Sequence, residues 1–212
     1  MQVTTLDFLR HGEPVGGKKY RGQIDDPLSE KGWAQMHAAI AGEMAAGVSP
    51  WQAIVSSPLR RCQAFADTVA VNLALPVAFD ARLAEVGFGV WEGKTAAQLK
   101  QHDPNCIFDF KCDPVGKRPE GAEPLQDFYR RVADAYEAML LRYAGQQVLV
   151  VAHAGVIRMA ICHALGLPPE RAYRINVASA AMARIRSETH IRSETQAEAR
   201  FDNLMWLSKG SG

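Results

Sequence analysis

The sequence lacks an excess of charge of either sign. Its 212 residues include 24 lysines and arginines against 23 aspartates and glutamates, which leaves a net charge of +1. Proteins that bind nucleic acid or an anionic membrane surface usually carry a clear basic excess, so we expect neither as a partner. Any basic cluster in this chain must be local, as a small anionic ligand would require.

Long apolar runs and paired cysteines are also missing. No run approaches the roughly 20 apolar residues of a membrane-spanning helix, and no basic leader precedes an apolar core. We therefore expect a cytoplasmic protein without a secretory signal. The cysteines show no CxxC spacing, which predicts free thiols and argues against a metal site. They are Cys62, Cys106, Cys112 and Cys162.

Apolar residues are plentiful, at 48% of the chain, which is enough for one domain with a sizeable core. Strand-like and helix-like segments alternate, which favours an α/β fold, namely a three-layer α/β/α sandwich around a mostly parallel, doubly wound sheet. The expected strands cover residues 3–9, 52–55, 76–79, 147–152, 181–187 and 199–207, and the expected helices cover 30–46, 58–73, 125–143 and 155–165.

Three segments fall outside this alternation. Residues 81–123 are rich in glycine, proline and aspartate, and we expect loops and short helices there, forming a small cap over one edge of the sheet. The pentapeptide IRSET occurs at 185–189 and again at 191–195; two copies are too few for a repeat fold and indicate an extended surface hairpin or a small duplication. We expect a single domain over residues 1–207 and a disordered tail over 208–212.

The first candidate site follows the first expected strand directly. The apolar run 3–9 ends in Arg10-His11-Gly12, and the carboxyl edge of a sheet is where α/β proteins place their sites. A histidine there can attack phosphorus, and an adjacent arginine can hold the phosphoryl oxygens. The tripeptide alone is a weak signal, because a histidine after a strand is usually structural.

Other segments carry side chains that suit the same chemistry. Arg60 and Arg61 follow a short strand at the start of a helix, and Glu85 lies in a glycine-rich loop. His153 stands where the strand 147–152 gives way to a helix, whose free N–H groups favour an anion. A neutral histidine can attack phosphorus, arginines hold phosphoryl charge, and a carboxylic acid can protonate a leaving alkoxide.

Together these motifs resemble the histidine phosphatase superfamily, the phosphoglycerate-mutase-like phosphatases, over most of residues 3–165. Within it, the segment 85–93 (EVGFGVWEG) is similar to the α-ribazole phosphatases and their broad-specificity relatives. The resemblance implies a phosphohistidine mechanism that needs no metal or other cofactor. The implied roles are nucleophile for His11, general acid for Glu85, hydrogen bonding to the phosphoryl group for His153, and phosphate binding for Arg10, Arg60, Gln23 and Ala154.

Four further residues receive secondary interpretations. Arg61 is interpreted as solvated or structural, and Glu92 as a weaker candidate for the acid. Gly12 and Gly155 are expected to let the backbone approach the phosphate closely, because glycine has no side chain.

The chain departs from the family pattern at one position of the phosphate site. Many members carry an asparagine six residues after the nucleophile, where this chain has Gly17. Basic residues follow it closely, and we expect either that one of them compensates or that they are simply solvated. They are Lys18, Lys19 and Arg21.

The resemblance implies a phosphomonoester hydrolase acting on a small phosphorylated metabolite, and α-ribazole 5′-phosphate of cobalamin biosynthesis is one candidate substrate. Two alternatives stay open: a phosphoglycerate mutase, and a non-catalytic protein that binds phosphorylated ligands. A mutase must exclude water from its phosphohistidine, and the cap segment 81–123 is short for that purpose, since the family's mutases usually carry a longer insertion there. Whether the chain is a monomer or a homodimer is also open.

Overall fold

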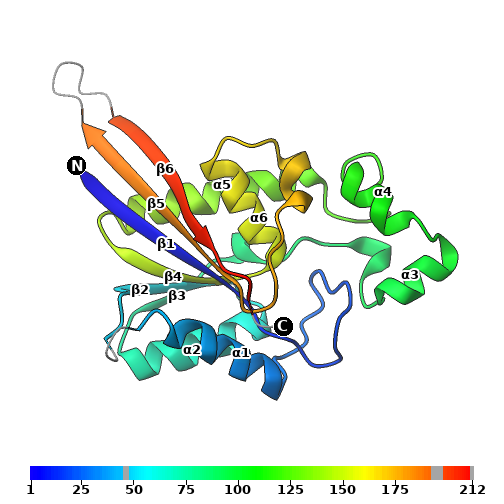
Figure 1. The fold of residues 1–212 in the computed structure, drawn as a ribbon, viewed down its shortest axis with the longest axis horizontal. Helices are drawn as coiled ribbons and strands as arrows, with labels where there is room; N and C mark the ends of the chain where they lie inside the picture. The colour runs from blue at the N-terminus through cyan, green and yellow to red at the C-terminus, as the bar shows by residue number, and fades with distance from the viewer. Residues whose placement is uncertain (45–47, 192–197, 211–212) are drawn as a thin grey trace.

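The computed structural model describes residues 1–44, 48–191 and 198–210. Its centre is a six-stranded sheet in the order β3-β2-β4-β1-β5-β6 (Figure 1). The four parallel strands are β3 (Val77–Phe79), β2 (Ala53–Ser56), β4 (Gln147–Ala152) and β1 (Gln2–Arg10). β5 (Met182–Ile191) pairs antiparallel with β1, and β6 (Glu198–Leu207) pairs antiparallel with β5. The expected α/β fold is confirmed, with an antiparallel pair at one edge.

Helices cover both faces of this sheet. α1 (Glu30–Ala41) and α2 (Arg60–Leu73) lie on one face, and α5 (Leu125–Arg142) and α6 (Ala154–Ala164) lie on the other (Figure 1). Because successive side chains of a strand point to opposite faces, each central strand contributes to two separate cores. In the described ranges, no helix is long and apolar enough to cross a membrane.

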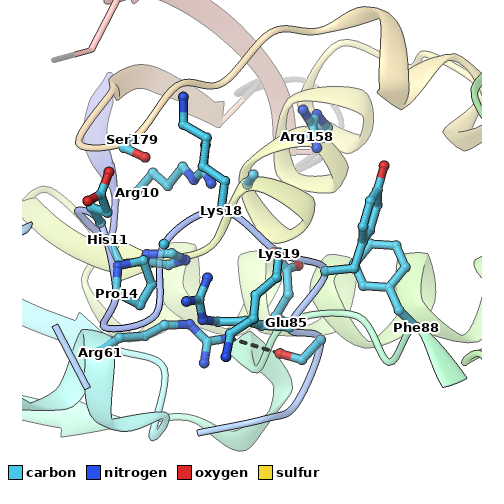
Figure 2. Close-up of a pocket in the computed structure, with 16 residues that line it drawn as sticks. Arg10, His11, Pro14, Lys18, Lys19, Arg61, Glu85, Phe88, Arg158 and Ser179 are labelled. Atoms are coloured by element: carbon cyan, nitrogen blue, oxygen red, sulfur yellow. Dashed lines mark hydrogen bonds between the residues drawn. The ribbon is translucent and has the colours of Figure 1, made fainter. Parts of the chain in front are cut away.

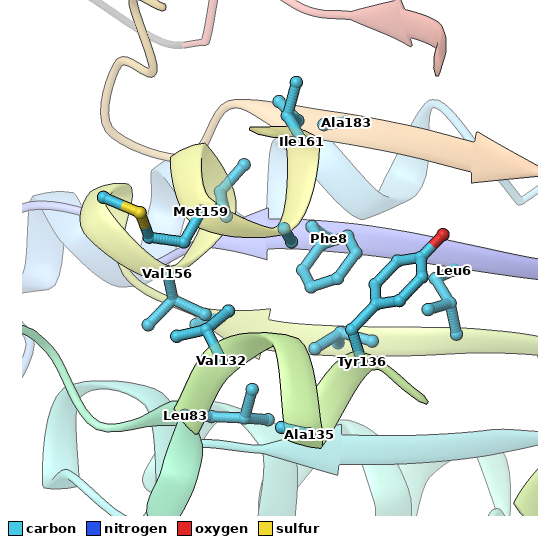
Figure 3. Close-up of a cluster of buried hydrophobic side chains, with 14 of the residues drawn as sticks. Leu6, Phe8, Leu83, Val132, Ala135, Tyr136, Val156, Met159, Ile161 and Ala183 are labelled. Carbon is cyan, nitrogen blue, oxygen red and sulfur yellow. The ribbon is translucent and has the colours of Figure 1, made fainter. Parts of the chain in front are cut away.

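The two cores draw on alternate residues of the same strands. Leu6 and Phe8 of β1 pack in one core with Tyr136 of α5 (Figure 3). Leu9, the next residue along β1, belongs to the other core together with Phe65 of α2. All five side chains are 0% exposed, and burying one of this size stabilises the fold by about 1.5–3 kcal/mol. Burial on both faces explains why the sequences of the central strands are nearly continuous apolar runs.

The start of α2 differs from the expected one in a way that bears on the site. The proline at position 58 was expected within the first turn, but the helix begins at Arg60 with Leu59 as its N-cap. The hydroxyl of Ser57 accepts a hydrogen bond from the Leu59 N–H at 3.3 Å. The two arginines of this segment therefore occupy the first turn of α2. The expected helix over 30–46 likewise ends earlier, at Ala41, and residues 45–47 lie outside the described ranges.

Short helices and loops form the segment between β3 and α5, as expected for residues 81–123. They are η2 (Ala81–Leu83), η3 (Gly89–Trp91), α3 (Ala96–His102) and α4 (Cys106–Cys112). α3 and α4 stand away from the sheet (Figure 1). A small core around Trp91 and Phe110 holds the segment together. Tyr173, from η4 (Pro169–Arg174), packs on Phe110 with ring centroids 4.6 Å apart.

The hairpin of β5 and β6 contains the first IRSET copy, and residues 192–195 of the second copy lie outside the described ranges. Arg184 of β5 anchors the hairpin, since it donates two hydrogen bonds, of 2.7 and 2.9 Å, to the buried carboxylate of Asp7. Ser208, the first residue of the expected disordered tail, exchanges hydrogen bonds with Met182.

Candidate active site

The site forms where the central parallel strands end. Arg10 of β1 and Ala152 of β4 are paired in the register, so the residues that follow them, His11 and His153, are neighbours at the carboxyl edge of the sheet. Their ring centroids lie 5.2 Å apart, in an edge-to-face arrangement at 64°. The structure thus brings together the two histidines that the sequence placed at separate strand ends.

His11 is oriented by its own backbone. Its Nδ1 lies 2.7 Å from the carbonyl oxygen of Gly12. A carbonyl can only accept a hydrogen bond, so Nδ1 carries the ring proton and Nε2 keeps its lone pair. Gly12 itself serves packing: a Cβ there would collide with the backbone of Gly32 in α1. Its role is this close contact between loop and helix, where we had expected an approach to phosphate.

The surroundings of His11 keep its ring neutral. The side chain is 6% exposed, and burial, followed by the charges of Arg10 and Arg61, lowers its pKa well below 6.5. Burial and the same arginines also lower the pKa of His153 well below that value. A neutral imidazole is the form that can attack phosphorus, and His11 has this form at neutral pH.

Two buried guanidinium groups line the same cavity as His11. Arg10 donates to the carbonyl of Val177 at 2.7 Å, and Arg61 donates to the carbonyls of Ile24 and Gly22 at 2.7 and 2.9 Å. The Nε of each arginine has no hydrogen-bond partner among the described residues. A buried N–H without a partner is costly, and a phosphoryl oxygen in the cavity is a suitable acceptor. Burial lowers the pKa of Arg10 to about 10, which leaves it charged at neutral pH.

The arginine of α2 that reaches the cavity is Arg61, and the expectation for Arg60 is therefore corrected. Arg60 is exposed, and its backbone N–H donates to Asp25 at 2.7 Å. Arg61 is 1% exposed. Consecutive helical residues differ by about 100° around the axis, so only one of the pair can face the sheet edge. The helical spacing in the sequence could have identified Arg61 as the inward-facing arginine, because it stands four residues before Phe65 and shares its helix face.

His153 is fully buried and is not among the described residues that line the cavity. Its Nε2 lies 2.8 Å from the hydroxyl of Ser57 and 3.6 Å from the sulfur of Cys62. That thiol is free, like those of the other three cysteines. The ring of His153 therefore contacts Ser57, and its predicted hydrogen bond to the phosphoryl group stays a prediction.

Glu85 lies at the N-terminus of α6. Its Oε1 accepts from the N–H of Val86 at 3.0 Å, and its Oε2 accepts from the N–H of Gly155 at 3.3 Å. A Cβ on Gly155 would collide with Oε1, so glycine makes room for the carboxylate and not for phosphate directly. Arg131 supports the loop by donating to the carbonyl oxygens of Ala84 and Glu85 at 2.7 and 3.2 Å. A carboxyl group held at a cavity wall can exchange a proton with a bound ester.

These groups surround a cavity of about 230 Å³ (Figure 2). Its lining includes six basic side chains: Arg10, Lys18, Lys19, Arg21, Arg61 and Arg158. Among the described residues that line it, two are acidic, Glu13 and Glu85. This is the local basic cluster that the balanced composition requires of an anion-binding protein. No group of three or more histidine, cysteine, aspartate or glutamate side chains in the described ranges is placed to hold a metal.

Two other candidates lie outside the cavity lining. Gln23 is exposed, and its backbone N–H donates to Oε1 of Glu92 at 3.2 Å. Glu92 also accepts from the N–H of Phe88 at 2.9 Å, so it joins two loops, and it is not among the described residues that line the cavity. Ala154, by contrast, lines the cavity, and its contact with phosphate stays a prediction.

The lining also holds residues for which the sequence predicts no role. Ser179 has no motif around it that could have singled it out. Arg158 follows Ala154 by four residues on α6, a spacing that places both on one helix face. Gly17 lines the cavity together with Lys18, so basic side chains do stand near the position of the missing asparagine.

The chain belongs to the histidine phosphatase superfamily (branch 1), whose family model matches residues 6–196. A bifunctional protein of Mycobacterium tuberculosis is 37% identical over 184 residues, which are 85% of this chain and 49% of that protein. The chain thus spans about half the length of this mycobacterial relative.

Solved structures of the family share the fold. A mycobacterial glucosyl-3-phosphoglycerate phosphatase is 27% identical, with a TM-score of 0.77 over 87% of this chain and 91% of that one. The α-ribazole phosphatase of Shigella flexneri is 28% identical, with a TM-score of 0.73 over 98% of both chains.

Proposed function

We propose that the chain is a phosphomonoester hydrolase that works through a phosphohistidine on His11. One observation carries the proposal: a neutral histidine, the carboxyl group of Glu85 and the buried guanidinium groups of Arg10 and Arg61 line one cavity. Together they supply a nucleophile, a proton donor and stabilisation of phosphoryl charge.

The reaction follows in two steps. The Nε2 lone pair of His11 attacks phosphorus and the P–O ester bond breaks, while Glu85 in its acid form gives its proton to the leaving oxygen. The Glu85 carboxylate then takes a proton from water, whose oxygen attacks phosphorus. The N–P bond breaks, which returns neutral His11 and releases phosphate. The arginines hold the phosphoryl oxygens through both steps.

A small phosphorylated metabolite suits the size and charge of the cavity. α-Ribazole 5′-phosphate remains one candidate, supported by the likeness to the Shigella flexneri phosphatase, while the likeness to a glucosyl-3-phosphoglycerate phosphatase supports a substrate with an acidic skeleton. The short cap helices favour hydrolysis over the mutase reaction. Free cysteines fit a reducing compartment such as the cytoplasm.

The decisive test compares the wild type with His11→Ala. The wild type should hydrolyse p-nitrophenyl phosphate, and the variant should lose at least about 10³-fold in kcat. Quenching during turnover of a radiolabelled ester should leave acid-labile, base-stable phosphate on the wild type alone. Near-normal hydrolysis by the variant would disprove the mechanism, and phosphoryl transfer in a bisphosphoglycerate-dependent assay would favour the mutase.

A further inference from the structure

Arg158 is a cation of the cavity that the proposed mechanism leaves unused. It lies on α6 one turn after Ala154, and both residues line the cavity. Residues four apart on a helix have Cβ atoms about 5–6 Å from each other. Arg158 therefore stands about one turn beyond the helix N-terminus, where Glu85 meets Gly155. Figure 2 shows it across the cavity from His11.

The side chain of Arg158 is held in place while its charge stays unpaired. Its Nε donates to the carbonyl of Ile175 at 2.8 Å, and its guanidinium carbon lies 5.6 Å from the ring centroid of Tyr173. Across the described residues, neither Nη atom has a hydrogen-bond acceptor or a carboxylate partner. Burial lowers the pKa of Arg158, and the nearby charge of Glu85 offsets part of this effect. A bound anion would stabilise the charged form further.

Two other cations that line the cavity are already paired with a carboxylate. Arg21 and Lys19 share the carboxylate of Asp26, with nitrogen–oxygen distances of 2.9 and 3.0 Å. Of the other lining cations, Lys18 is exposed at the rim and, like Arg158, has no carboxylate partner in the ranges that the structure describes. Two cations thus remain free beyond the group that binds the transferred phosphate.

Arg61, which the proposed mechanism assigns to the transferred phosphate, is held differently. Arg61 uses both Nη atoms to bind the carbonyl oxygens of Ile24 and Gly22. Arg158 is fixed through Nε and the ring beneath it, which leaves both Nη atoms free. A planar pair of Nη donors matches two oxygens of a carboxylate or a phosphate.

We propose that Arg158, with Lys18 at the rim, binds a second anionic group of the substrate. The preferred substrates are then small phosphomonoesters that carry a carboxylate or a second phosphate in addition to the transferred phosphoryl group. This inference rests on the proposed function, because it names the substrate class of the same site.

Two matched pairs of esters test the proposal. 3-Phosphoglycerate and glycerol 3-phosphate differ only in a carboxylate against a hydroxymethyl group, and 1,3-propanediol bisphosphate and its monophosphate differ in a second phosphate. The wild type should prefer the doubly acidic member of at least one pair by about 10- to 100-fold in kcat/KM. The preferred pair identifies the second anion.

Arg158→Met should remove this preference. We expect kcat/KM for glycerol 3-phosphate and p-nitrophenyl phosphate to stay within about threefold of the wild type, while the doubly acidic ester loses the whole advantage. Arg158→Lys, which keeps the charge without the paired donors, should lie between. Arg130→Met is the matched control, because Arg130 is 71% exposed on α5 and is not among the lining residues.

An equal loss on all esters in Arg158→Met would overturn the proposal, since it would assign Arg158 to the transferred phosphate or to the cavity wall. The absence of any preference in the wild type would overturn it too. If the wild type hydrolyses none of the esters, the proposed function fails separately. The same pairs are then compared by isothermal titration calorimetry, where tighter binding of the doubly acidic ester, lost in Arg158→Met, supports the second-anion site and equal binding refutes it.

Discussion

The rings of His11 and His153 stand edge to face with their centroids 5.2 Å apart. Both are buried, and both lie beside Arg10 and Arg61. A proton on either ring would add a charge to an environment that already holds two desolvated guanidinium groups. Both rings are therefore neutral at neutral pH. The burial of the two rings thus affects both the nucleophilicity of His11 and the pH dependence of the stability of the fold.

Acid should destabilise the fold through this pair. In the unfolded chain each histidine takes up a proton near pH 6.5, whereas the folded pKa values lie well below that. The unfolded state then binds more protons as the pH falls below 6.5, so the free energy of unfolding decreases there and is fully retained above it. Each group contributes a slope of up to about 1.4 kcal/mol per pH unit.

Urea unfolding between pH 7 and pH 5 measures this slope. His153→Asn should remove its own share of the pH dependence, and the double variant with His11→Asn should remove both. An unchanged slope in the double variant would assign the acid sensitivity to other groups.

Adjacent arginines of α2 should differ sharply in their importance. Arg61→Met removes a buried cation from the cavity and should lower kcat/KM for p-nitrophenyl phosphate by about 10²–10³-fold, as the loss of a preorganised donor does elsewhere. Arg60→Met changes the same charge on an exposed side chain and should leave activity within about twofold. Steady-state kinetics decide the matter, and a larger loss in Arg60→Met would reassign the phosphate ligand.

Glu85→Gln should separate alkyl from aryl esters. An alkoxide needs the proton that Glu85 supplies, whereas p-nitrophenolate leaves without one, and such catalysis is typically worth about 10²–10⁴-fold. The alkyl-to-aryl ratio of kcat/KM should therefore fall in this variant. In Arg10→Met both rates should fall together, because phosphoryl charge must be stabilised for any leaving group. A constant ratio in Glu85→Gln would place the proton donor elsewhere.

Gly155→Ala should reproduce the defect of Glu85→Gln without touching the carboxyl group itself. The added Cβ would collide with Oε1 of Glu85 and lie 3.1 Å from the Phe128 ring, so the carboxylate must move. The matched control is Gly42→Ala after α1, where φ is −66° and the Cβ would lie 3.7 Å from the carbonyl oxygen of Ala39. Kinetics with both ester types test the pair. Wild-type behaviour of Gly155→Ala would show that the position of Glu85 is unimportant.

Local patterns predicted the elements well where burial and capping act within a few residues. β4 lies at 147–152 as expected, because burial on both faces leaves a purely apolar run between polar ends. α1 begins after Ser29 as expected, since that side chain caps the helix by accepting from the Gly32 N–H at 3.0 Å. The end of α1 was predicted too late, because apolar residues at helical spacing continue to Met44, whereas the helix ends at Ala41 with Gly42 as its C-cap.

The sequence by itself determined the alternation of strands and helices, the two strand ends that carry His11 and His153, and the loop that carries Glu85. Each of these features depends on the pattern of apolar, polar and glycine residues within a short stretch of chain. Only the tertiary structure decided which side chains meet there. The phase of α2 selects Arg61 over Arg60, the edge of β2 brings Ser57 to His153, and the face of α6 adds Arg158 to the cavity. These choices depend on strand register and helix rotation, which are set by packing between segments far apart in the chain.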